Sequence, residues 1–193
     1  MPSLVFSLLP LALLIAPQGD FARDALNLGR THDQALYDSF NAGYRLTPSG
    51  GVERVEMITE FRRAVMIVRQ HAEQGEYSFD ANDLQAALAP YRGVIAFVVD
   101  VRLHPLNTFA KPPAYDVYVR TGRDTKPLPA TGFKREALYP PGLGAPGAAM
   151  TGIRLEASFP RVDVANAADP LLVVTDDRGD VLWQGRIDLA RFR

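Results

Sequence analysis

The periodicity of the apolar residues changes near Gly93, and this change constrains the fold more than any other feature of the chain. Before Gly93, apolar side chains recur every three to four residues, which is the period of an amphipathic helix. After Gly93, they alternate or run continuously in segments rich in Val and Ile, as β-strands do. We therefore expect an α+β protein, with a helical region over residues 20–92 and a β-sandwich region over residues 93–193. Residues 20–193 are expected to form one compact unit.

Three capped helices are expected in the first region. Their predicted ranges are 31–43, 52–74 and 80–90. Thr31, with Gln34 three residues later, has the spacing of a capping box, and Ser49 and Asp80 are the expected caps of the second and third helices. The second helix is the longest, and its apolar residues fall mainly on one face. This face predicts helix packing against a core.

Five strands are expected in the second region, and a sixth segment has a weaker strand pattern. The strands are predicted over 94–103, 114–120, 153–159, 171–175 and 181–189, and the weaker segment covers 133–139. The last two strands form a hairpin, with Trp183 and Ile187 on its inner face. Short strands separated by turns predict an antiparallel β-sandwich, for which an immunoglobulin-like arrangement is one option, with the N-terminal helices packed on it.

An apolar run opens the chain and predicts export. Residues 1–19 contain no charged side chain, and the run over residues 4–16 has the length of the apolar part of a signal peptide. No basic residue precedes the run and no clear cleavage motif follows it. The alternative is a buried first helix or strand. We expect a periplasmic or extracellular protein without a stable membrane span after processing, because the run is short and Pro10 interrupts it.

The composition excludes several classes of protein. The chain has no cysteine, which excludes disulfide bonds, cysteine-bound zinc and a lipid-anchored cysteine. The formal net charge is −1, with acidic and basic residues interleaved along the chain. Such a charge pattern does not favour a nucleic acid as partner.

His104, Asp100 and Arg102 are the candidate catalytic residues. Asp100 and Arg102 share one face of a predicted strand, and His104 opens the proline-rich loop that follows. A histidine base oriented by a carboxylate could act in hydrolysis, but Asp100 and His104 are about 13 Å apart along an extended strand. The alternative is a loop histidine that only binds backbone groups.

Asp176, Asp177 and Asp180 are the candidate metal ligands. They lie in the predicted hairpin turn, where three carboxylates could attract calcium. Their spacing differs from that of an EF-hand loop, and polar residues are common in hairpin turns. The alternative is therefore an ordinary turn.

These observations predict a non-enzymatic, exported protein of the bacterial envelope that acts as an interaction or scaffold module. Its expected partner is a protein or a surface polymer, and no cofactor is expected. Two alternatives stay open: an extracytoplasmic hydrolase with a site near His104, and a calcium- or carbohydrate-binding module.

Overall fold

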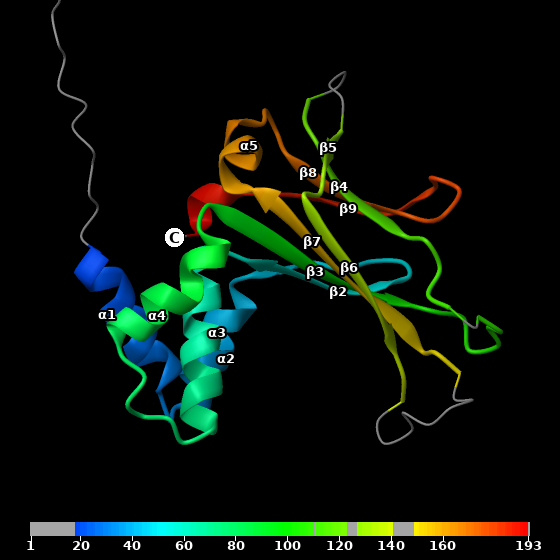
Figure 1. Cartoon of the computed structure of the whole chain (residues 1–193). Coiled ribbons are helices and arrows are strands. Elements are labelled where there is room, and N and C mark those ends of the chain that lie inside the picture. The colour runs from blue at the N-terminus through cyan, green and yellow to red at the C-terminus, as the bar shows by residue number, and fades with distance from the viewer. Residues whose placement is uncertain (1–17, 110, 123–126, 141–148, 193) are drawn as a thin grey trace, which may run out of the picture.

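The computed structural model describes residues 18–109, 111–122, 127–140 and 149–192. Residues 1–17, which make up most of the predicted export segment, lie outside the described residues, as do residues 141–148 of a predicted loop. The described part of the chain is a mixed α+β structure with two antiparallel sheets (Figure 1). Within that part, no helix combines the length and the apolar character needed to cross a membrane.

The first four α-helices of the described chain lie before residue 90, and two strands separate the second helix from the third. These helices are α1 (Gln18–Gly29), α2 (Gln34–Ala42), α3 (Glu60–Glu73) and α4 (Ala81–Leu88), and the short 3-10 helix η1 (Ala89–Tyr91) follows α4. The predicted cap Asp80 is confirmed, because its side chain accepts hydrogen bonds from the first turn of α4. The predicted capping box of Thr31 is wrong, since α2 begins one residue after Asp33, whose carboxylate accepts from Leu36 N at 3.0 Å.

The long helix predicted over residues 52–74 is wrong in its first third. Residues 52–58 form the strand β2 (Val52–Ile58), and α3 begins only after Thr59, whose hydroxyl accepts from Arg62 N. Ser49 accordingly caps no helix and lies in the turn before β2. Glu53, Arg54 and Glu56 favour helices when exposed, but here they stand on a strand and form ion pairs across its outer face.

The first sheet has five strands, in the order β1-β2-β3-β7-β6. Besides β2, its members are β1 (Arg45–Leu46), β3 (Val94–Arg102), β7 (Gly152–Pro160) and β6 (Gly132–Leu138). The strands β3 and β7 confirm the strands predicted over 94–103 and 153–159. The strand β6 confirms that the weaker segment 133–139 is also a strand. The predicted helical region therefore contributes two strands to this sheet.

The second sheet has four strands, in the order β5-β4-β8-β9. They are β5 (Leu128–Pro129), β4 (Asp116–Arg120), β8 (Leu171–Thr175) and β9 (Val181–Arg186). The predicted hairpin is confirmed by the antiparallel pairing of β8 with β9. The helix α5 (Arg161–Asn166) follows β7, and the 3-10 helix η2 (Leu189–Arg191) follows β9.

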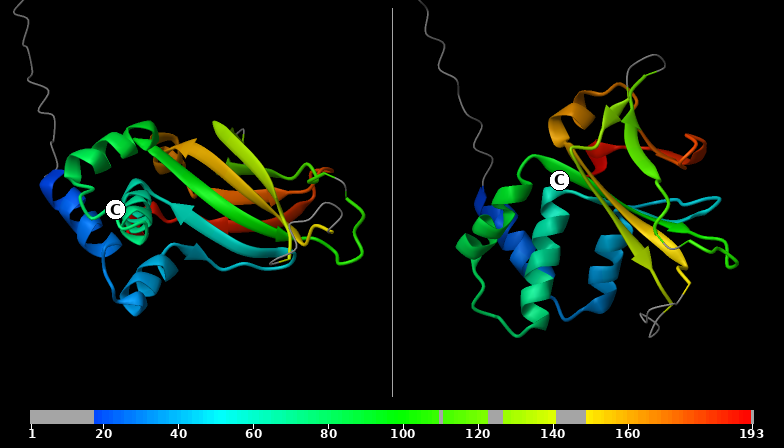
Figure 2. Two further views of the ribbon diagram at one scale, coloured as in Figure 1. Left: turned by 60° about the horizontal axis from the view of Figure 1, so that its bottom comes forward. Right: turned by 45° about the vertical axis from the view of Figure 1, so that its right-hand side comes forward.

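Two clusters of buried side chains hold these elements together. The larger cluster contains side chains from both sheets, among them Phe97, Phe159, Leu172 and Trp183. The smaller cluster lies among α1, α3 and α4. Figures 1 and 2 show the helices α1–α4 at one end of the five-stranded sheet. The opposite end of this sheet carries the loops that follow β3 and β6, because Arg102, Gly152 and Leu138 pair in register there.

Candidate functional site

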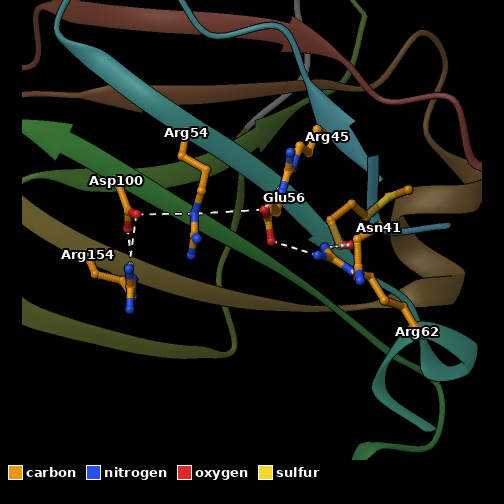
Figure 3. A network of polar contacts seen from close by, with 8 residues as sticks. Asn41, Arg45, Arg54, Glu56, Arg62, Asp100 and Arg154 are labelled. Atoms are coloured by element: carbon orange, nitrogen blue, oxygen red, sulfur yellow. Dashed lines mark hydrogen bonds and ion pairs between the residues drawn. The ribbon is translucent and has the colours of Figure 1, made fainter. Parts of the chain in front are cut away.

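Asp100 belongs to a network of ion pairs on the outer face of the five-stranded sheet (Figure 3). Arg154, directly opposite on β7, donates from Nε and from a terminal nitrogen to the two carboxylate oxygens, at 2.8 and 3.1 Å. This hydrogen bond to Asp100, together with nearby acidic charges, raises the pKa of Arg154 against the opposing effect of burial. The Arg54 Nε atom lies 3.1 Å from Asp100 but is not aimed at it for a hydrogen bond. Asp100 is thus bound from both neighbouring strands.

Glu56 is the second carboxylate of the network, and it joins the sheet to the helices. Its Oε2 atom accepts a 2.7 Å hydrogen bond from Arg62 of α3, and its Oε1 atom accepts from Arg45 of β1 at 3.2 Å. Arg62 also donates to Met57 O and, through Nε, to Asn41 of α2. Burial opposes ionisation of Glu56, but the arginines outweigh it and hold the pKa of this carboxyl below its usual value. The network therefore fastens β1, β2, α2 and α3 together.

The other two candidate catalytic residues have separate contacts. Arg102 lies at the end of β3, largely exposed, and its Nε atom is 3.5 Å from a carboxylate oxygen of Glu53. The Nδ1 atom of His104 accepts a hydrogen bond from the backbone of Leu106 at 3.1 Å. In the described part of the chain, the contacts of Asp100, Arg102 and His104 join no two of these residues. Asp100, Arg102 and His104 therefore each contact different partners.

The candidate metal ligands lie in the turn between β8 and β9. The carboxylate of Asp176 accepts hydrogen bonds from the backbone nitrogens of Arg178 and Asp180, at 2.9 and 2.8 Å. Gly179 adopts a φ of 86°, as the sequence predicts for this turn. Among the residues that the structure describes, no group of three or more His, Asp or Glu side chains is arranged to hold a metal ion.

Three large apolar side chains stand in solvent at the loop end of the five-stranded sheet, and sequence analysis missed them. Leu106 is 83% exposed, Phe109 is 50% exposed and Tyr139 is 45% exposed. We call these three residues the apolar patch. Leu106 and Phe109 lie in the loop after β3, and Tyr139 directly follows β6. Since β3 and β6 flank β7 and end at the same level, the two loops leave the sheet side by side.

Asn107 holds the first of these loops in place. Its side-chain nitrogen donates to His104 O and to Met150 O, both at 2.8 Å, and its side-chain oxygen accepts from Phe109 N at 3.3 Å. The bond to Met150 ties this loop to the chain segment that leads into β7. The apolar patch is therefore presented by a hydrogen-bonded loop that keeps Leu106 and Phe109 in water.

The two sequence stretches that carry the apolar patch contain almost no charged residue. Lys111 is the one charged side chain in the two sequence stretches 103–115 and 139–151, which contain no acidic residue. A contiguous segment with exposed apolar side chains and few charges is typical of a contact surface for another molecule. This lack of charge is visible in the sequence and could have indicated an apolar surface. An apolar loop residue can also be buried beneath its own loop, however, and the sequence looks the same in both cases. Only the exposed fractions distinguish the two cases.

The comparisons with known proteins identify no relative. No protein-family model matches the chain, and neither the curated proteins nor the solved structures contain a match.

Proposed function

We propose that the protein is exported to the bacterial envelope or beyond, and that it acts there as a non-enzymatic interaction or scaffold module. The apolar patch is the observation that carries this proposal. Large apolar side chains held in water are unfavourable by about 1.5 to 3 kcal/mol each relative to burial. A partner that covers Leu106, Phe109 and Tyr139 would recover this free energy. We propose a protein surface as that partner.

The arrangement of the elements fits such a module. We propose that the two sheets form a β-sandwich, of an immunoglobulin-like kind, with the helices packed at one end. The shared core cluster of both sheets supports the sandwich. In this architecture the loop end is a rigid platform, and loops on a rigid platform are common sites of recognition.

The contacts of the candidate catalytic residues support a binding module over the hydrolase alternative. A hydrolase near His104 would need a carboxylate that orients the imidazole. Asp100, the candidate for this role, is bound by Arg154 on one side and lies beside Arg54 on the other. In the same way, Asp176 uses its carboxylate to hold the backbone of its own turn, which supports a structural role over calcium binding.

Fractionation of cells that produce the full chain tests the export part of the proposal. We expect the chain in the periplasmic or extracellular fraction, with a processing point between about Ala16 and Ala22. N-terminal sequencing measures this point directly. Recovery of the intact chain from the cytoplasm would contradict both export and a role in the envelope.

Site-specific photo-crosslinking in intact cells tests the interaction part. A photoreactive phenylalanine analogue in place of Phe109 is expected to give a discrete adduct, which Leu106→Ser abolishes. Tyr77 is the matched control position, because its side chain is 62% exposed but lies between α3 and α4, at the helical end. Equal adducts from positions 109 and 77, or an adduct from position 109 that persists with Leu106→Ser, would contradict the proposal.

A further inference from the structure

Two cavities share Asp169 as a lining residue. The larger cavity has a volume of about 530 Å³, lies between α5 and η2, and is lined among others by Asp169, Arg186 and Asp188. The smaller cavity has a volume of about 380 Å³ and is lined by Arg120, Gly122, Asp169 and Leu171. Because Asp169 lines both cavities, we treat the two cavities together and call them the Asp169 cleft.

Asp169 has an unusual backbone conformation at the centre of this cleft. Its φ is 48°, and it is the one non-glycine residue with a positive φ in the described part of the chain. Its carboxylate forms an ion pair with Arg186, which also lines the larger cavity. Both side chains are largely exposed, so water screens this pair and it contributes little to stability. Sparsely populated backbone conformations occur often at ligand sites, and here the residue with this conformation lines both cavities.

Two arginines share the face of the sheet that borders the cleft. Arg120 on β4 and Arg186 on β9 both pair in register with Leu171 on the strand between them. The two arginines are therefore about 10 Å apart at the backbone, which is twice the spacing of neighbouring strands. Arg120 donates to Gln184 at 2.9 Å, and Arg186 pairs with Asp169. A carboxylate of a ligand could replace either partner, because guanidinium groups bind carboxylates with two parallel hydrogen bonds.

The other groups of the cleft indicate the chemical class of the ligand. The carboxylates of Asp169 and Asp188 are hydrogen-bond acceptors, and they line the same cavity as the guanidinium donor of Arg186. A ligand hydroxyl group can bind to either kind of side chain, because a hydroxyl both donates and accepts hydrogen bonds. Pro170, Leu171 and Leu189 add apolar surface, against which the C–H groups of a sugar ring can pack. We propose that the Asp169 cleft binds a saccharide that carries carboxylate groups, with Arg120 and Arg186 as the residues that bind the carboxylates.

Titration of the full chain with a short oligogalacturonate tests this proposal, with calorimetry and amide chemical shifts as the readouts. We expect binding with shift changes centred on residues 120–122, 164–171 and 186–190. Arg120→Gln and Arg186→Gln should each weaken binding about tenfold, since each removes a charge-assisted hydrogen bond. Arg178→Gln, at an exposed turn at the far end of the hairpin, is the matched control and should leave the affinity unchanged.

The substitution Asp169→Asn tests whether the Asp169 carboxylate competes with the ligand for Arg186 or only maintains the local structure. Asparagine also tolerates the positive φ, but it removes the negative charge that competes with the ligand for Arg186. The affinity for oligogalacturonate should therefore rise several-fold. A neutral maltooligosaccharide of the same length and a short oligoglutamate are the comparison ligands, and both should bind more weakly.

Three results would overturn the proposal. They are no binding of oligogalacturonate, equal binding of the maltooligosaccharide, and equal or tighter binding of oligoglutamate, which would indicate an acidic peptide instead. Each of these results concerns the Asp169 cleft alone. The crosslinking at Phe109 tests the proposed protein contact separately.

Discussion

At the scale of single residues, we expect the buried ion pair of Glu56 and Arg62 to contribute to the stability of the fold. The Arg62 side chain is only 4% exposed, and it bonds to the strand, to α2 and to Glu56. A buried pair of charges gains little over an apolar pair, because both charges lose their hydration. Removing one partner is much more costly, since the other charge then stays buried without compensation.

We therefore expect Glu56→Gln to lower the free energy of unfolding by about 3 kcal/mol. Urea denaturation followed by circular dichroism measures the change. Glu73→Gln is the matched control, because Glu73 is largely exposed and pairs with Arg69 on the surface of α3. That substitution should change stability by less than about 0.5 kcal/mol. Equal effects of the two substitutions would show that the burial of the Glu56–Arg62 pair does not affect the free energy of unfolding.

The lowered pKa of Glu56 predicts a pH dependence of stability. The ordinary value is 4.5, and the folded value lies below it because the arginines stabilise the ionised form. The contribution of Glu56 is therefore fully present above the unfolded pKa and is lost as the pH falls through the folded pKa. Between pH 7 and pH 3, wild-type protein should lose more stability than Glu56→Gln. Parallel stability profiles of the two proteins over this range would contradict the prediction.

At the scale of elements, β2 shows why a local pattern can mislead. Val52, Val55 and Met57 face the core that both sheets share, whereas Glu56 and Ile58 face outward. The charged residues of this segment suit an exposed helix as well as a strand with ion pairs. The pairing of β2 with β1 and with β3 decides between them, and the pairing with β3 joins residues that are distant in the sequence, such as Val52 and Val101.

The contact of α1 with α3 depends on Gly29. A Cβ atom at this position would lie 2.6 Å from two side-chain carbons of Val68 and 2.8 Å from Val65 O. Gly29→Ala should lower the free energy of unfolding by about 1 to 3 kcal/mol through overpacking, although alanine favours helices. The melting temperature measures this effect. Gly51→Ala is the control, because a Cβ atom at that position meets no atom within 4 Å. A similar loss of stability in both variants would exclude a role for the close approach of Gly29 to Val65 and Val68.

At the scale of the whole molecule, α1 is the first element of the described chain and packs into the helical cluster. Ala22 and Ala25 are buried in the helical cluster, and the ring of Phe21 lies 5.4 Å from that of Phe61. Deletion of residues 1–17 should leave the melting temperature unchanged. Deletion of residues 1–29 exposes the apolar faces of α3 and α4, and should lower it by about 10 °C or more.

Calorimetry of the two truncated proteins checks this prediction. A large loss on deletion of residues 1–17 would show that the apolar run packs against the folded unit. That result would favour the alternative of a buried first element over an export segment. Export and cleavage, by contrast, require that the chain fold stably from about Gln18 onward.

The sequence by itself determined the elements whose pattern depends on local forces. The apolar runs of β3 and β7, the hairpin turn at Gly179 and the cap at Asp80 were all predicted correctly, because periodicity, backbone freedom and capping act over a few residues. The tertiary structure decided the rest. It made 52–58 a strand, bound Asp100 between two arginines, and left Leu106 in solvent. Each of these outcomes depends on which distant segments pair or cover one another, and a local sequence pattern carries no information on that.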